Sequence, residues 1–129
     1  MAEITSTSGT SSFASLKGRR VLVVEDEYML AEGLRRELED HGAEVVGPVG
    51  TIADALELLR SGPAPDIAVL DINLQGEMAY PVADMLRAQG VPFIFATGHD
   101  PQAIPPAYAD VPRAEKPVAL REVARATLR

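Results

Sequence analysis

The chain has 129 residues, of which 47% are hydrophobic; its formal net charge is −7 and it contains no cysteine. This length suits one domain with a real core, and no apolar stretch approaches the roughly 20 residues that a membrane span needs. The lack of cysteine excludes disulfides and thiolate metal sites and fits a reducing cytoplasm. The negative charge argues against nucleic-acid binding through a basic face.

Residues 1–17 are rich in serine and threonine. They lack the basic start and apolar middle of a secretory signal, and they are not the arginine-rich sequence of a transit peptide. We therefore expect a disordered N-terminal tail over residues 1–17 and a single domain over residues 18–129.

After the tail, short apolar runs alternate with segments whose apolar residues recur at helical spacing. Thr51 stands where a helix N-cap is expected, and Gly42 and Gly90 stand where helices end. The predicted first half is a strand at 21–24, a helix at 28–41, a strand at 44–49, a helix at 52–60 and a strand at 67–70. The predicted second half begins with a turn at Gly76, a helix at 80–89 and a strand at 93–96. A proline-rich stretch at 98–110 has room for at most a short helix. A strand at 111–115 and a closing helix at 119–128 complete the chain.

Strands that alternate with helices predict an α/β fold with a parallel sheet covered on both faces. Right-handed crossovers make this a doubly wound fold of five strands, for which the flavodoxin-like order 2-1-3-4-5 is favoured. In such a sheet the carboxyl ends of the strands meet at one edge, and ligands bind there.

Polar residues follow four of the five predicted strands. Glu25 and Asp26 come after the first strand, Asp71 ends the third, Thr97 follows the fourth and Lys116 follows the fifth. Each has an ordinary explanation by itself, since acids suit a helix N-terminus and Asp or Thr suits a cap or a turn. Their occurrence together at strand ends predicts a shared site.

The acids of this set are candidate ligands for Mg²⁺, which prefers hard oxygen ligands. Carboxylates gathered without a cation repel one another, so the cluster makes most chemical sense as a metal site. Asp26 and Asp71 are the candidate direct ligands, Glu25 is a candidate ligand through water, and the backbone carbonyl of Asn73 is a further candidate.

Asp71 is also a candidate nucleophile, because a carboxylate can form an aspartyl-phosphate. Phosphoryl transfer needs positioning and charge stabilisation, and Asp71 is already ionised at neutral pH. In this interpretation the Lys116 ammonium and the Thr97 hydroxyl bind the phosphoryl oxygens.

The ordered set Glu25-Asp26, Asp71, Thr97 and Lys116-Pro117 resembles a response-regulator receiver domain, over about residues 19–129. The resemblance implies that Asp71 accepts a phosphoryl group, with Mg²⁺, from a histidine kinase or a histidine phosphotransfer protein. It implies a signalling module of a two-component phosphorelay, which catalyses its own phosphorylation and dephosphorylation and is not a metabolic enzyme.

Residues 92–99, Pro-Phe-Ile-Phe-Ala-Thr-Gly-His, are similar to the FAT GUY subgroup of bacterial receivers. Many members of that subgroup stand alone and act by protein contact or as phosphate sinks. The chain ends just after the closing helix, so we expect no attached output domain. Pairing of two copies through the face of the fourth helix, fifth strand and fifth helix is left open.

Two residues depart from the common pattern of these families. His99 stands where the subgroup usually has tyrosine, and it is a candidate for modulating hydrolysis of the acyl phosphate. Arg113 stands where many receivers carry an aromatic switch residue, three positions before Lys116. We therefore expect switching mainly through ordering of residues 98–110 when Asp71 is phosphorylated.

Two alternatives compete with a phosphorylated receiver. A pseudo-receiver would have the same fold and bind partners without phosphorylation, against which the intact set of site residues argues. A phosphatase of the haloacid-dehalogenase type would need a second aspartate two residues after Asp71, where this chain has Asn73. Nucleotide binding is disfavoured because no glycine-rich phosphate loop follows a strand.

Overall fold

The computed structural model describes residues 15–98 and 103–127. Its main sheet has five parallel strands in the order β2-β1-β3-β6-β7, which confirms the predicted order of first to fifth strand. The strands are β1 (Arg20–Val24), β2 (Glu44–Val49), β3 (Ile67–Asp71), β6 (Phe93–Thr97) and β7 (Arg113–Glu115).

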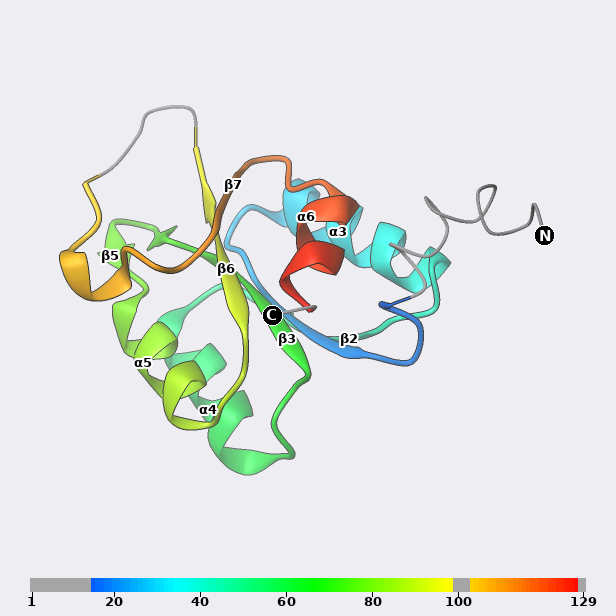
Figure 1. Cartoon of the computed structure of the whole chain (residues 1–129), viewed down its shortest axis with the longest axis horizontal. Helices are drawn as coiled ribbons and strands as arrows, with labels where there is room; N and C mark the ends of the chain where they lie inside the picture. Colours follow the sequence, from blue (N-terminus) through cyan, green and yellow to red (C-terminus); the bar gives the residue numbers. More distant parts are fainter. Residues whose placement is uncertain (1–14, 99–102, 128–129) are drawn as a thin grey trace.

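Four helices cover the two faces of this sheet, with α4 and α5 on one side and α3 and α6 on the other (Figure 1). They are α3 (Tyr28–Asp40), α4 (Ile52–Ser61), α5 (Tyr80–Ala88) and α6 (Leu120–Ala126). All lie within two residues of their predicted bounds. The Thr51 hydroxyl caps α4 as predicted, because it accepts a hydrogen bond of 3.0 Å from the backbone N–H of Asp54.

The sheet divides the core into two apolar clusters. Leu22 and Val24 of β1 pack with buried residues of α4 and α5, whereas Val21 and Val23 pack with those of α3 and α6. Successive side chains of a strand point to opposite faces, so a strand covered on both sides must be apolar throughout. This arrangement explains why the predicted strands at 21–24, 67–70 and 93–96 read as unbroken apolar runs.

The connection after β3 contains a short antiparallel hairpin that the sequence did not predict. It consists of β4 (Asn73–Leu74) and β5 (Glu77–Met78), and Gln75 and Gly76 at its turn have φ values of 54° and 91°. The turn expected at Gly76 is present. Strands of two residues leave no alternation that could be recognised in a sequence.

The proline-rich stretch has the limited helical structure that was expected of it. In its described part after residue 102, the only helical element is the 3₁₀ turn η1 (Pro106–Tyr108). Residues 99–102, and with them His99, lie outside the described residues.

The start of the domain differs from the expectation of a tail up to residue 17. Leu16 is fully buried in the cluster with α3 and α6, so the packed chain begins before residue 18. The boundary was predicted too late because serine and threonine dominate the surrounding residues and a single leucine gives no periodic pattern. Residues 1–14 of the expected tail lie outside the described part. Among the described residues, no helix is both long and apolar enough to cross a membrane.

Candidate functional site

The carboxyl ends of the central strands bring the predicted site residues to one edge of the sheet. Asp71 lies opposite Ala96 in the pairing of β3 with β6, and Thr97 lies opposite Glu115 in the pairing of β6 with β7. Lys116 follows β7, and its backbone N–H donates a hydrogen bond of 2.8 Å to the Thr97 carbonyl. The register of three strands therefore fixes where the Lys116 side chain starts.

Lys116 reaches two buried carboxylates. Its Nζ lies 3.0 Å from Oδ2 of Asp71 and 3.6 Å from Oε1 of Glu25. Asp71 is 2% exposed and Glu25 is 9% exposed, so both acids are almost removed from water. A buried charge needs partners, and one ammonium is shared here between two carboxylates.

Asp26, the third acid, completes a cluster that could hold a metal ion. Glu25, Asp26 and Asp71 each offer a carboxylate oxygen, and these oxygens all lie within 4.8 Å of one another. Three carboxylates beside one ammonium leave an excess of negative charge. Hard oxygen donors in this number suit Mg²⁺, so the donor set fits the ion that the sequence suggested.

Burial dominates the electrostatics of the site. It raises the pKa of Glu25 to about 7, opposed by the Glu27 N–H that donates to Glu25 Oε2. It also raises the pKa of Asp71, against the lowering effect of the hydrogen bonds from Lys116 and from the Asn73 N–H. For Lys116 the effect of burial is outweighed by the two carboxylates, which raise its pKa. The ammonium is therefore charged at neutral pH.

The raised pKa of Glu25 predicts that metal binding depends on pH. A carboxylate must lose its proton to hold a cation, so with a pKa of about 7 the affinity for Mg²⁺ should be about tenfold lower at pH 6 than at pH 8. The folded state without metal binds more protons than the unfolded chain between pH 4.5 and 7. Its stability should therefore fall as the pH rises through that window.

Thermal unfolding with Mg²⁺ or with a chelator, at both pH values, measures this effect. Stabilisation by Mg²⁺ should be larger at pH 8, and Glu25→Gln should remove most of the difference between the two pH values. Equal stabilisation of the wild-type protein at pH 6 and pH 8 would contradict the assignment of Glu25.

Asn73 contributes its backbone to the site and its side chain to the hairpin. Its N–H donates to Oδ1 of Asp71 at 3.1 Å, while its side-chain Oδ1 accepts from the Gly76 N–H at 2.7 Å. These two bonds orient the Asp71 carboxylate and fix the start of the β4–β5 hairpin. The role of the Asn73 carbonyl as a metal ligand stays a prediction.

The other predicted residues take different positions. Thr97 is half-buried at the end of β6, directly after Ala96, which lies opposite Asp71, and Arg113 is exposed on β7. Because this residue is an arginine, position 113 has no aromatic ring that could move into the interior.

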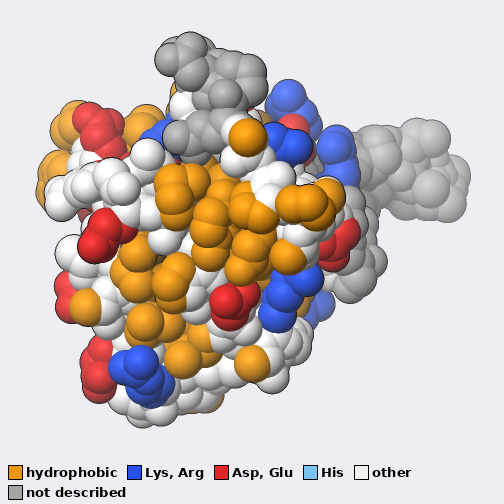
Figure 2. Space-filling view, turned by 90° about the vertical axis from the view of Figure 1, so that its left-hand side faces the viewer, with side chains coloured by type: hydrophobic (Ala, Val, Ile, Leu, Met, Phe, Trp, Pro, Cys, Tyr) orange, Lys and Arg blue, Asp and Glu red, His pale blue; other side chains and the backbone are white. Residues whose placement is uncertain are grey.

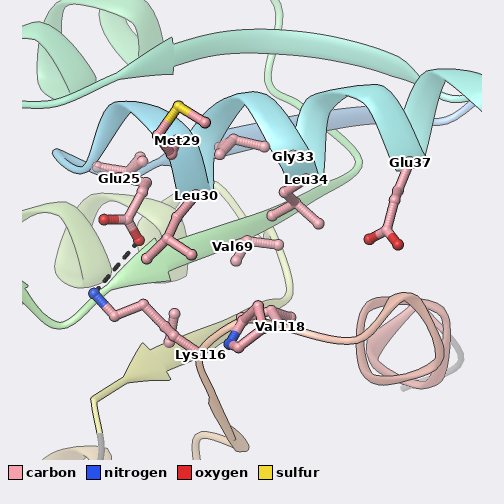
Figure 3. A pocket seen from close by; sticks show the side chains of 13 residues that line it. Glu25, Met29, Leu30, Gly33, Leu34, Glu37, Val69, Lys116 and Val118 are labelled. Carbon is pink, nitrogen blue, oxygen red and sulfur yellow. Dashed lines mark ion pairs between the residues drawn. The ribbon is translucent and has the colours of Figure 1, made fainter.

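A cavity of about 370 Å³ beside the site was not predicted. It lies between α3 and residues 116–118, with Leu30, Leu34 and Val69 along it and Glu25 and Lys116 at one end (Figure 3). The helical spacing of Leu30 and Leu34 had indicated only a buried face of α3. The other wall of the cavity is formed by residues 116–118, which are distant from α3 in sequence, so the pattern of α3 could not predict the cavity.

Comparison with known proteins agrees with this geometry. The family model of the response regulator receiver domain matches residues 21–111. The sensory transduction protein LytT of Bacillus cereus is 35% identical over 88 residues, which cover 66% of this chain and 35% of LytT. The nitrate/nitrite response regulator protein NarP of Escherichia coli is 34% identical over 73 residues, covering 56% of this chain and 34% of NarP. The chain thus spans about a third of the length of these curated relatives.

Solved structures extend the likeness to nearly the whole chain. The solution structure of SdrG from Sphingomonas melonis Fr1 has a TM-score of 0.73 and 38% identity, covering 88% of this chain and 95% of that one. The response regulator PhyR from Brucella abortus has a TM-score of 0.71 and 25% identity, covering 98% of this chain and 54% of that one. Fold, site geometry and family match agree, and the chain belongs to the response regulator receiver domain family, the signalling modules of two-component systems.

Proposed function

We propose that this receiver domain accepts a phosphoryl group on Asp71, with Mg²⁺, from the phosphohistidine of a histidine kinase or a histidine phosphotransfer protein. The observation that carries the proposal is the contact of Lys116 Nζ with Asp71 Oδ2 at 3.0 Å inside a cluster of three carboxylates. An ionised carboxylate held by an ammonium beside a divalent-cation site is what phosphoryl transfer requires.

The residues divide the reaction between them. An oxygen of Asp71 attacks phosphorus and forms the new P–O bond, while the P–N bond to the donor imidazole breaks and its electron pair stays on that nitrogen. Lys116 turns from the carboxylate to a phosphoryl oxygen, and the Thr97 hydroxyl donates to another. Asp26 and Asp71, with Glu25 through water, would hold Mg²⁺, whose positive charge would offset the charge of the phosphoryl oxygens.

Intact-mass measurement tests this proposal directly. The protein is incubated with Mg²⁺ and acetyl phosphate, a small phosphodonor, and a parallel sample contains a chelator in place of Mg²⁺. We expect a gain of one phosphoryl group in the first sample only, and loss of that gain with hydroxylamine, which cleaves acyl phosphates. No gain with Mg²⁺ would favour a pseudo-receiver that only binds partners.

We further propose that the protein acts in the cytoplasm as a single-domain regulator of the FAT GUY subgroup, by protein contact or as a phosphate sink. The sequence of residues 92–99 supports this proposal. Phosphotransfer from each histidine kinase of the source organism in turn would identify the donor. A phosphate sink would make the phosphorylated donor lose its phosphate faster when this protein is present. The phosphorylated form of this protein would then bind no downstream partner.

A further inference from the structure

Aromatic residues form a cluster next to the proposed phosphorylation site. The rings of Tyr80 and Tyr108 are stacked, with centroids 4.7 Å apart and an angle of 10° between their planes. Phe95 meets both rings edge-on, with centroids 6.2 Å from each. Figure 2 shows hydrophobic side chains gathered on this face of the molecule, where α5 and η1 lie.

Polar contacts tie Tyr108 to helix α5. The phenol donates a hydrogen bond of 2.6 Å to Oδ1 of Asp84, and the guanidinium of Arg87 lies 5.4 Å from the centre of the Tyr108 ring. Arg87 also pairs with Asp110 at 2.7 Å, two residues beyond Tyr108. One tyrosine thus fastens η1 to α5 through stacking, a hydrogen bond and a cation–π contact.

The same cluster is connected to the site through two short segments. Phe95 precedes Thr97 by two residues on β6, so both side chains lie on the same face of that strand. Tyr80 follows Ala79, whose N–H donates a hydrogen bond of 2.9 Å to the carbonyl of Ile72, the residue after Asp71. A movement of Thr97 would therefore displace Phe95, and a movement of the backbone after Asp71 would displace Tyr80. Tyr108 contacts both of these rings.

We propose that Tyr108 is the aromatic residue that responds to phosphorylation of Asp71, in place of an aromatic residue at Arg113. Its stack on Tyr80 and its hydrogen bond to Asp84 stabilise the unphosphorylated conformation, and they open when Thr97 moves to the phosphoryl group. For Tyr108 this direction is the reverse of the ordering of residues 98–110 that was expected from the sequence. This inference rests on the proposed function of Asp71. Because such coupling is reciprocal, weakening the contacts of Tyr108 must favour the phosphorylated form.

Binding of beryllofluoride, a phosphoryl mimic, tests the coupling in both directions. The chain has three tyrosines and no tryptophan, so near-ultraviolet circular dichroism reports on few rings. In the wild-type protein we expect the tyrosine signal to change when Mg²⁺ and beryllofluoride are added. Tyr108→Phe keeps the ring but loses the bond to Asp84, and it should bind beryllofluoride about fivefold more tightly.

Two further variants separate this contact from general effects. Asp84→Ala removes the acceptor, so it should tighten binding as Tyr108→Phe does, and the double variant should gain little beyond either single one. Tyr28→Phe is the matched control, since Tyr28 is 73% exposed and lies outside the cluster, and it should bind as the wild type does.

The outcomes distinguish this inference from the proposal on which it rests. Wild-type affinity in Tyr108→Phe, together with an unchanged tyrosine signal in the saturated wild-type protein, would overturn the role of Tyr108 and leave phosphorylation of Asp71 intact. Failure of the wild-type protein to bind beryllofluoride with Mg²⁺ would overturn both.

Discussion

Asp71→Asn should abolish phosphorylation, with no gain in mass after incubation with Mg²⁺ and acetyl phosphate. The amide has nearly the shape of the carboxylate and still offers an oxygen to Lys116, but it is not a nucleophile toward phosphorus. The loss should be complete, because the reaction needs an ionised oxygen at this position. The domain should stay folded, since the substitution removes one charge from a cluster with an excess of carboxylates.

Asp66→Asn is the matched control for this loss. Asp66 is exposed and stands just before β3, at the opposite end of the strand that Asp71 terminates, where its Oδ2 accepts a hydrogen bond of 2.8 Å from the Arg20 N–H. This variant should be phosphorylated to the same extent as the wild-type protein. A gain in mass that survives Asp71→Asn would place the phosphoryl group elsewhere and contradict the proposed function.

Lys116→Met should produce the largest loss of stability among substitutions at the site. It leaves Asp71 and Glu25 buried side by side without their shared ammonium, and two such carboxylates cannot both stay ionised at low cost. At pH 8 without metal, the free energy of unfolding should fall by roughly 2 to 4 kcal/mol, between the values for exposed and fully buried ion pairs. Phosphorylation should slow as well, because a phosphoryl oxygen loses its cation.

The pH dependence of this loss identifies its cause. Below pH 6 a proton can replace the missing cation on the carboxylate pair, and at pH 8 added Mg²⁺ can do so, so either condition should reduce the destabilisation. Denaturant unfolding at the two pH values measures it. The chain has only one other lysine, the exposed Lys17, and Lys17→Met should change stability by less than about 0.5 kcal/mol. An equal loss at both pH values for Lys116→Met would show that packing, rather than charge, is responsible.

Much of the fold could be predicted because local and global signals agree in this chain. Strands such as β3 are buried on both faces and therefore read as apolar runs, and Thr51 marks the start of α4 by its own hydrogen bond. The position of Asp71 beside Lys116 followed from a rule of parallel sheets, whose strand ends share one edge. This rule needs only the positions of the strand ends in the sequence, and it does not need a known contact between Asp71 and Lys116.

The parts that could not be predicted depend on contacts between distant segments. Leu16 belongs to the core only because α3 and α6 leave room for it, and its neighbours in sequence are polar. The stack of Tyr108 on Tyr80 joins segments that no periodicity connects. A sequence pattern reports which face of an element is apolar, but it does not report which distant ring meets that face.

The start of the packed chain has a practical consequence for building sensors. The hydroxyl of Ser15 lies 3.2 Å from that of Thr127, just beyond α6, so the two ends of the described domain meet. They meet near the start of β1, whereas Asp26 and the other site residues lie beyond its end. A domain with adjoining ends can be inserted into a surface loop of a host protein, such as a fluorescent reporter, without stretching either chain. The host would then sit away from Asp71, and a phosphodonor would still have access to this proposed phosphorylation site.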